Sequence, residues 1–552
     1  MFAEYGRQII AIILLGNVMC FLFACNGEDP DPAVAELPPT LARQDVSEGM
    51  ISRTAVPPTA VATANAPDAA GTGEVEPTAT AVAGIAGVTE AESPMVEENM
   101  ATGEKATEEP LAMPAPGQSR GYQTTPEELE EIKRKADEGI EPYRTAVNWI
   151  FEEARKGWNY ELQTQETCSD AHNPAWNDNG AGTAALYAKA LVYQLSEEEA
   201  YAEEVKNILQ RIMTEVESID VNDEQCPLNF AWGAPELVAS ADLIEGYWYD
   251  QECTGPVSTL HSNTTLGSGN CKELFQNWLV KNPYYIVSET AQATTSNWGA
   301  AATNATAHIA DFLWDRPDVT LNHRNPSQIN NGKEYALTAA EAYALANDAA
   351  IERMNGYRVE YESVWSCDRF GFNVKQSSEW EPVKSQISEK GIIPEDARRK
   401  EYCNIPQYNN AFKHSYPQLH LGNNIQQCEL MLRRGDRSCY DNVDNSDIPD
   451  YTYSDAFGFN RTTHLYPGRG SIERAINAII VDAGISWQQD PALEVAYRYY
   501  LNNQTVPGVE QWFGELNRRR ARCVNHLCFG LLTHGFAAGE SPQDPPAVAP
   551  PR

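Results

Sequence analysis

The chain has 552 residues, of which 42% are hydrophobic, and its 78 acidic residues outnumber its 41 basic ones. This length suits roughly two to four domains, or one large domain with appended segments. The net charge of −37 repels phosphate backbones, which excludes nucleic-acid binding as the main function. The chain has one apolar run, near its N-terminus, which excludes a membrane protein with several spanning segments.

That apolar run has the features of an export signal. Arg7 precedes about 16 mostly apolar residues, from Ile9 to Ala24, a length typical of a secretory signal peptide. The run ends in Leu-Phe-Ala-Cys at residues 22–25, which resembles a bacterial lipobox. We therefore expect residues 1–25 to be a lipoprotein signal peptide, with a lipidated Cys25 anchoring the exported protein to the outer membrane, in the periplasm or at the cell surface. An ordinary signal peptide in which Cys25 is incidental is the alternative.

Cysteine usage agrees with export. Apart from the two cysteines of the signal region, ten of the twelve cysteines remain, an even number that indicates disulfides in an exported chain. Cys253 and Cys271, and likewise Cys523 and Cys528, are close enough in sequence to be natural pairs. A metal site is the rival interpretation, but the chain has no Cys-x-x-Cys or paired Cys/His spacing. No metal and no cofactor are expected.

Two segments are predicted to be disordered. Residues 26–120 are rich in Ala, Pro, Thr and Glu and contain no Trp, so they cannot bury enough surface to offset their chain entropy. Residues 537–552 form a Pro-rich tail of similar character. The globular domain is therefore expected at 121–536, held away from a membrane by the linker.

The globular domain reads as helical throughout. It begins at residues 125–128, Thr-Pro-Glu-Glu, whose N-cap Thr, first-turn Pro and following Glu form a capping-box signal. Strand alternation is scarce, so we expect an all-α fold of antiparallel helix pairs, which fits an α/α toroid, an incomplete barrel of helical hairpins. We also expect the protein to be a monomer. Further helices are predicted at 182–195, 196–219, from 235, and at 303–314, 336–354, 421–434, 471–483, 491–502 and 509–522.

Four ordered segments carry a family resemblance. They read Leu-Asn-Phe-Ala-Trp-Gly-Ala-Pro at 228–235, Thr-Ser-Asn-Trp-Gly at 295–299, His-Ser-Tyr-Pro-Gln-Leu-His-Leu-Gly at 414–422, and Pro-Ala-Leu-Glu-Val-Ala-Tyr-Arg-Tyr-Tyr at 491–500. In this order they resemble segments of the alginate lyase family, over roughly residues 140–502. Two departures stand out, because Trp298 replaces the family's His beside Asn and the His414 segment replaces its Arg-Asp…Gly-His-Thr segment.

The resemblance implies β-elimination of a uronate-containing, alginate-like polysaccharide. The proton at C5 of a uronate is barely acidic, so a group that hydrogen-bonds the neighbouring carboxylate must stabilise the developing charge. Asn297 takes this role by its motif, whereas His414 and Tyr416 are candidates for the acid and base that move protons. The alternative for Asn297 is a helix N-cap, and for His414 and Tyr416 a hydrogen-bonded core position.

Three further residues are expected to bind the sugar. Trp298 and Trp232 would stack on sugar faces, and His420 would contact the substrate, although a Trp is more often a core residue. The acidic composition counts against an anionic polysaccharide unless a local basic groove exists. Two other functions therefore remain open, a non-catalytic glycan-binding lipoprotein on the same fold and a glycoside hydrolase on a similar toroid.

Overall fold

A computed structural model provides the three-dimensional structure. It describes residues 111–166, 168, 181–220, 225–293, 297–324, 334–354, 358–359, 416–441, 451–454, 460–464, 471–482 and most of 484–551. All of them belong to one compact unit, Gly103–Arg552. The signal peptide, Cys25 and most of the predicted linker lie outside the described residues.

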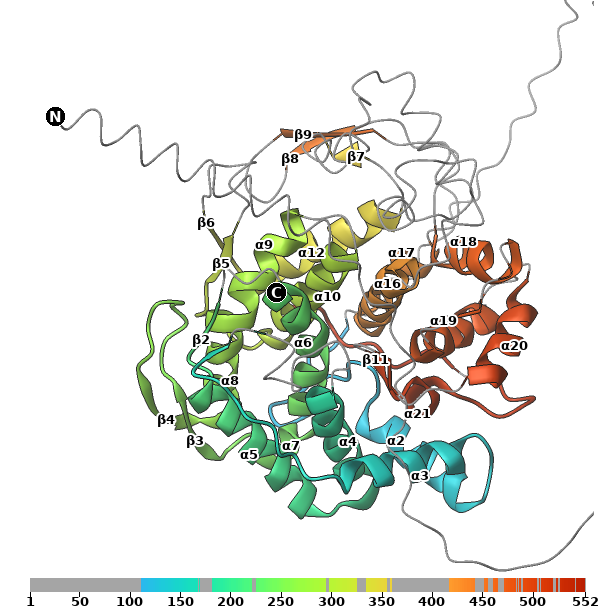
Figure 1. The fold of residues 1–552 in the computed structure, drawn as a ribbon, viewed down its shortest axis with the longest axis horizontal. Helices are drawn as coiled ribbons and strands as arrows, with labels where there is room; N and C mark the ends of the chain where they lie inside the picture. Colours follow the sequence, from blue (N-terminus) through green and yellow to red (C-terminus); the bar gives the residue numbers. More distant parts are fainter. Residues whose placement is uncertain are drawn as a thin grey trace, which may run out of the picture. The chain divides into compact units, whose positions relative to one another are not determined.

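The described part of the chain is mostly helical, which confirms the all-α class (Figure 1). None of the described helices is both long and apolar enough to cross a membrane. The α-helices are α2 (Pro126–Asp137), α3 (Tyr143–Ala154), α4 (Ala181–Ser196), α5 (Glu199–Glu215), α6 (Gln225–Leu243), α7 (Glu245–Trp248), α8 (Cys271–Leu279), α9 (Tyr285–Ala293), α10 (Asn297–Phe312), α12 (Ala339–Met354), α16 (Tyr416–Arg433), α17 (Ser438–Asp441), α18 (Ile472–Asn477), α19 (Asp490–Asn503), α20 (Val509–Arg519) and α21 (Gly530–His534). Two π-helical segments are η1 (Val280–Tyr284) and η5 (Ala478–Asp482).

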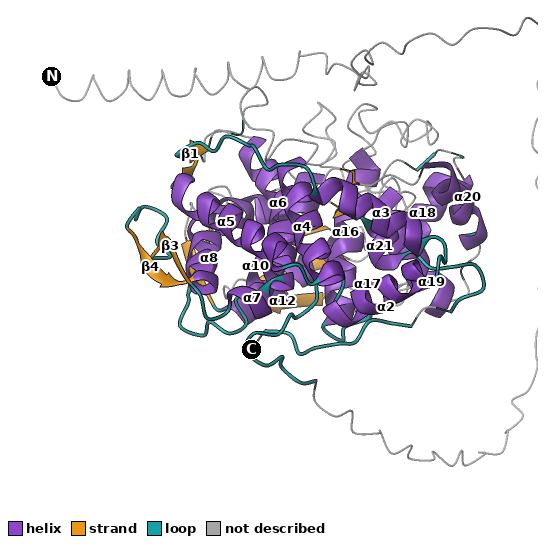
Figure 2. Ribbon diagram, turned by 90° about the horizontal axis from the view of Figure 1, so that it is seen from below, coloured by secondary structure: helices purple, strands orange, loops and turns teal. Residues whose placement is uncertain are grey.

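The strands are short, and the β10–β11 pair packs against α16 and α19. In the described residues they form four two-stranded sheets and one three-stranded sheet, and the β3–β4 hairpin extends from the edge of the helical body (Figure 2). The strands are β1 (Gln165–Glu166), β2 (Ser218–Ile219), β3 (Glu252–Pro256), β4 (Leu266–Asn270), β5 (Leu321–Arg324), β6 (Glu334–Leu337), β7 (Arg358–Val359), β8 (Tyr451–Ser454), β9 (Asn460–His464), β10 (Cys523–Val524) and β11 (Leu527–Cys528).

The helix starts test the capping signals of the sequence. At α2 the predicted capping box is confirmed, since the backbone N–H of Glu128 donates to Thr125 Oγ1 at 3.2 Å and the Glu128 carboxylate accepts from the Thr125 N–H at 2.8 Å. Ser196, the predicted start of the third helix, instead ends α4 and donates its hydroxyl to Val192 O. Pro235, predicted to open a helix, lies inside α6, where burial of the surrounding apolar side chains outweighs one lost backbone bond.

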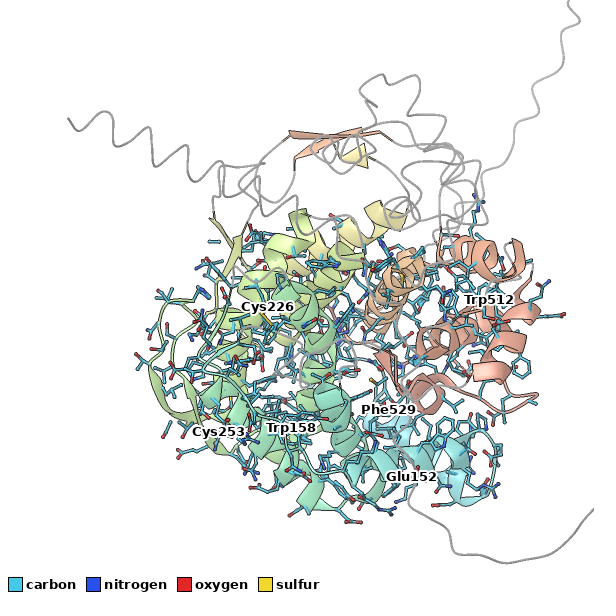
Figure 3. All side chains as sticks on the ribbon, in the orientation of Figure 1. Glu152, Trp158, Cys226, Cys253, Trp512 and Phe529 are labelled. Carbon is cyan, nitrogen blue, oxygen red and sulfur yellow. A yellow bond between two sulfur atoms is a disulfide. The ribbon has the colours of Figure 1, made fainter. Side chains whose placement is uncertain are left out.

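Two hydrophobic clusters form the core. The first gathers side chains from α2 to α12 and from α21, and the second gathers those of α16 to α20. In Figure 3, Trp158 and Cys226 lie in the N-terminal group of helices and Trp512 in the C-terminal group. Helix α10 is buried on nearly every face, so it is a central helix rather than an amphipathic surface one.

Contacts between side chains fix the directions of the central helices. Asn304 Nδ2 of α10 donates to Gln426 Oε1 of α16 at 2.7 Å. Further along, Asp311 of α10 pairs with Arg434, the residue directly after α16, at 2.7 Å. Asn304 precedes Asp311 by seven residues, and Gln426 precedes Arg434 by eight, which is about two turns in each case. Because both contacts advance along the two helices in the same direction, α10 and α16 run parallel.

Neighbouring helices share this direction. The last turns of α6 and α10 meet at Arg120, whose backbone N–H donates to Asp242 at 2.7 Å and whose guanidinium pairs with Asp311 at 2.9 Å. The side chain of Gln194, near the end of α4, donates to Leu243 O at the end of α6. Since α4 and α6 pack side by side, as do α6 and α10, the helices α4, α6, α10 and α16 end on one side of the domain and begin on the other.

Buried ion pairs hold the ends of these helices together. Asp311 is fully buried between Arg120 and Arg434, which are also buried. A second set lies nearby, where Arg433 pairs with Glu429 at 2.8 Å and with Glu128 at 2.9 Å. Burying these charges is favourable only because each has an opposite charge and hydrogen bonds.

The segments flanking the domain take part in the same end. Arg120, the last residue of the predicted disordered linker, is 2% exposed because of its pairing with Asp311. The tail predicted to be disordered also packs here, since Val548 N–H donates to Arg433 O at 3.0 Å and Ala549 N–H to Ala112 O at 3.2 Å. These bonds join residues far apart in sequence, which local composition does not reveal.

The disulfides agree with the sequence where they are described. Cys253–Cys271 is present, as predicted, and closes the base of the β3–β4 hairpin. Cys528 is disulfide-bonded and lies opposite Cys523 in the β10–β11 pair. Two further bonds, which the sequence did not assign, are Cys168–Cys226 and Cys428–Cys439.

Burial of His308 in α10 makes the fold sensitive to acid. Burial lowers the pKa of His308 to about 4, although its Nδ1–H donates to Asn304 O at 2.9 Å. Above pH 6.5 His308 is neutral in both folded and unfolded chains, whereas between pH 6.5 and 4 only the unfolded chain gains a proton. This difference should remove about 3 kcal/mol of folding free energy over that range.

The His308→Gln variant should not show this loss. We expect the difference in unfolding free energy between wild type and variant, measured by urea titration, to shift by about 3 kcal/mol in favour of the variant from pH 7 to pH 4. Other titrating groups cancel in this difference. A difference that is independent of pH would contradict the assignment.

Candidate active site

The first helical residue of α10 is Asn297, one of the predicted catalytic residues. The sequence predicted a helix only from residue 303, but small side chains extend it back to Asn297, and Thr303 donates its hydroxyl to Gly299 O at 2.6 Å. Asn297 is 1% exposed, and its Oδ1 accepts no hydrogen bond from the described residues. This unpaired atom is an acceptor, so it can take a hydrogen bond from a ligand hydroxyl, whereas a ligand carboxylate would need the amide Nδ2 donor.

The first helical residue of α16 is Tyr416, the second predicted catalytic residue that the structure describes. Pro417 follows it in the first turn, where a missing N–H costs nothing. Tyr416 is half-buried, so its side chain retains access to solvent. His420, one turn further along, is 1% exposed.

The two helix starts lie at the same end of the domain. Asn297 precedes Asn304 by seven residues, and Asn304 bonds Gln426, so Asn297 is level with residue 419 of α16. Because α10 and α16 are parallel and packed together, Asn297, Tyr416 and His420 share the end opposite the buried ion pairs. The structure thus brings Asn297 to the same end as Tyr416 and His420, which lie more than one hundred positions further along the chain.

The remaining predicted residues have different outcomes. Trp298 also belongs to this end and is partly exposed, as a sugar-stacking residue requires. Trp232 of α6 is 6% exposed and belongs to the first hydrophobic cluster, which leaves little of its ring for a sugar. His414 lies outside the described residues.

The sequence reasoning overlooked Glu236 of α6. This carboxyl is fully buried, and burial raises its pKa well above the ordinary value, although a hydrogen bond from Thr183 lowers it. Asp242 of α6 and Asp311 of α10 both bind Arg120, so they are level with each other. Six residues before them, Glu236 of α6 is level with residue 305 of α10, which is about two turns further along that helix than Asn297. A Glu flanked by Ala, Pro, Leu and Val at 234–238 was the available signal.

The α10–α16 interface is lined by amides with spare capacity. Asn304 Oδ1, Asn423 Oδ1 and Gln426 Nε2 are all buried and form no hydrogen bond with the described residues. Among the described residues, no group of three His, Cys, Asp or Glu side chains is placed to hold a metal ion.

Comparisons with known proteins add a fold likeness. No protein-family model and no curated protein matches the chain. Among solved structures, the chain is similar to an alginate lyase from Bacteroides ovatus, with 13% sequence identity and a TM-score of 0.40, over 74% of this chain and 99% of that one. With identity and TM-score this low, the chemistry proposed for this chain rests on the residues at the two helix starts.

Proposed function

We propose that this protein is a polysaccharide lyase that cleaves a uronate-containing, alginate-like polysaccharide by β-elimination. The observation that carries the proposal is the placement of Asn297, Tyr416 and His420 at one end of two parallel helices. An amide and a tyrosine are the residue types that this reaction needs, and they come from the segments with the family resemblance.

The reaction requires two proton movements. A base removes the C5 proton, the electron pair forms the C4–C5 double bond, and the C4–O4 bond breaks while an acid protonates the leaving oxygen. Tyr416, half-buried at the helix start, would act as acid, base or both, with His414 as the other candidate. The Nδ2–H of Asn297 would donate to the substrate carboxylate as charge develops there, and the unpaired Oδ1 would accept from a sugar hydroxyl.

The architecture and location follow as part of the same proposal. The parallel helices α4, α6, α10 and α16 would be the central helices of an incomplete α/α toroid, and helices running in the opposite direction would connect them. The site would then lie where the central helices start. The described disulfides suit an exported protein. Mass spectrometry of the mature protein should find acyl chains on Cys25, and an unmodified N-terminus elsewhere would refute the anchor.

Ultraviolet absorbance tests the activity directly. The full chain is incubated with a panel of polymers, including alginate and other uronate polysaccharides, and the unsaturated product is followed by its absorbance. Turnover of at least one polymer is expected. Tight oligosaccharide binding without any product would replace the lyase by a glycan-binding protein, and reducing ends without a double bond would indicate a glycoside hydrolase.

Asn297→Ala should lower kcat more than it raises KM. Charge on the carboxylate grows mainly in the transition state, so losing this donor should reduce kcat about 10²–10³-fold. Asn304→Ala is the matched control, because Asn304 is a buried amide two turns along the same helix. It should lower stability but leave the kcat of folded protein near normal. Equal losses in both variants would assign Asn297 to helix structure alone.

A further inference from the structure

A second binding feature lies on the outer side of the domain. A groove of about 980 Å³ lies between α3 on one side and α19 and α20 on the other, with residues 536–541 along it. We call it the aromatic groove. Pockets of about 300–1,000 Å³ are the size that accommodates a small ligand or a few sugar units.

Aromatic and aliphatic side chains form its walls. The ring of Tyr497 is parallel to that of Phe536, at 5.8 Å and 5°, and lies 5.9 Å from that of Phe513. Trp149 of α3 lines the opposite wall. Phe513 and Leu501 are 44% and 42% exposed, which leaves apolar surface that a ligand can cover.

The charged groups of the groove are carboxylates. Among the side chains that line it, Glu141 and Glu540 are the ones that carry charge at neutral pH. Glu540 accepts from Tyr143 Oη at 2.5 Å and from Ala537 N–H at 2.9 Å and pairs with Lys135 at 3.3 Å, and Glu141 pairs with Arg144 at 2.8 Å on the exposed surface. Carboxylates accept hydrogen bonds from hydroxyl groups, and since no Lys or Arg is among the described lining residues, a ligand anion would find no unpaired cation there. The groove therefore suits a ligand rich in hydroxyl donors and without negative charge.

We propose that the aromatic groove binds a short stretch of a neutral glycan. Pyranose rings would lie on the faces of Phe513 and Trp149, and sugar hydroxyls would donate to Glu141 and Glu540. The groove shares no residue with the Asn297 site, so this inference does not rest on the proposed lyase activity.

Isothermal titration calorimetry of the full chain tests the proposal. The probes are neutral hexasaccharides of glucose, mannose and xylose, with a uronate hexasaccharide for comparison. At least one neutral probe should bind, and Phe513→Ala should weaken its binding about three- to tenfold. Leu260→Ala is the matched control, because Leu260 is 55% exposed and lies next to the β3–β4 hairpin, away from the groove.

The outcomes separate this site from the lyase site. Phe513→Ala should leave turnover of a soluble uronate substrate unchanged, and Asn297→Ala should leave binding of the neutral probe unchanged. Absence of binding by every neutral probe at millimolar concentration would overturn the proposal. So would binding that Phe513→Ala does not weaken, a groove that takes only a proline-rich peptide, or self-association that Phe513→Ala abolishes.

Discussion

Asp311→Asn should destabilise the protein by about 3–5 kcal/mol, the cost of breaking a buried ion pair from one side. Asp311 is fully buried, and its carboxylate binds both Arg120 and Arg434. Burial alone would raise the pKa of Asp311, but the two guanidinium groups lower it below its ordinary value. Asparagine keeps the shape of the side chain and leaves two buried cations without an anion.

Equilibrium urea unfolding measures this loss. Asp318→Asn is the control, since Asp318 also pairs with an arginine, Arg316, at 2.9 Å, but its side chain is 65% exposed. That variant should lose less than about 1 kcal/mol, because exposed ion pairs contribute little. Similar losses in the two variants would mean that the charges around Asp311 are compensated by other groups.

A triple variant separates charge from packing. Replacing Arg120 and Arg434 by Met together with Asp311 by Leu removes all three buried charges. It should recover part of the stability lost in Asp311→Asn, because apolar side chains of similar volume can replace a buried ion network. No recovery would show that the hydrogen bonds of Arg434 to the Arg120 and Gly121 carbonyls matter more than charge balance.

Local signals predicted the fold well where the determining contacts are local. The capping box of Thr125 and Glu128 joins residues three apart, and the periodicity of residues 491–502 locates α19 to within one residue at each end. Arg120 was assigned to the disordered linker because composition alone was available. Its ordering depends on Asp311, 191 positions away, and no local pattern contains that information.

The candidate site shows the same division. The ordered segments identified Asn297 and Tyr416, but the parallel packing that places them at one end depends on the Asn304–Gln426 and Asp311–Arg434 contacts. Trp232 was proposed for sugar stacking from its motif. Its side chain is only 6% exposed, which shows that it packs in the core, and the motif does not indicate this. Glu236 escaped notice because an isolated buried Glu has no spacing signature.

Tyr416→Phe should reduce turnover about 10²–10⁴-fold, the range typical of a lost general acid or base. Phenylalanine keeps the ring volume and its packing at the start of α16, so folding should change little. The phenolic O–H, the one group of this side chain that transfers a proton, is removed. Steady-state kinetics on the polymer that the full chain cleaves, together with a thermal unfolding scan, separate the two effects.

Tyr201→Phe is the matched control for this variant. Tyr201 is also half-buried and lies in α5, on the outer side of the first hydrophobic cluster. Removing its hydroxyl should leave both turnover and stability near wild type. A loss of turnover in both variants would indicate a general effect of removing tyrosine hydroxyls.

The pattern of losses assigns the roles at the site. If Tyr416 moves the proton and Asn297 stabilises the carboxylate, the double variant should lose less than the product of the single losses, because the two groups act on one transition state. Near-normal turnover of Tyr416→Phe beside a strong loss in Asn297→Ala would keep the lyase and move the base elsewhere. His464 of β9, Tyr361 and Tyr466 would then be the residues to replace, since each offers a group that can accept a proton. An inert Asn297→Ala would be more damaging, because the proposed mechanism relies on this amide to stabilise the charge that forms when the C5 proton leaves.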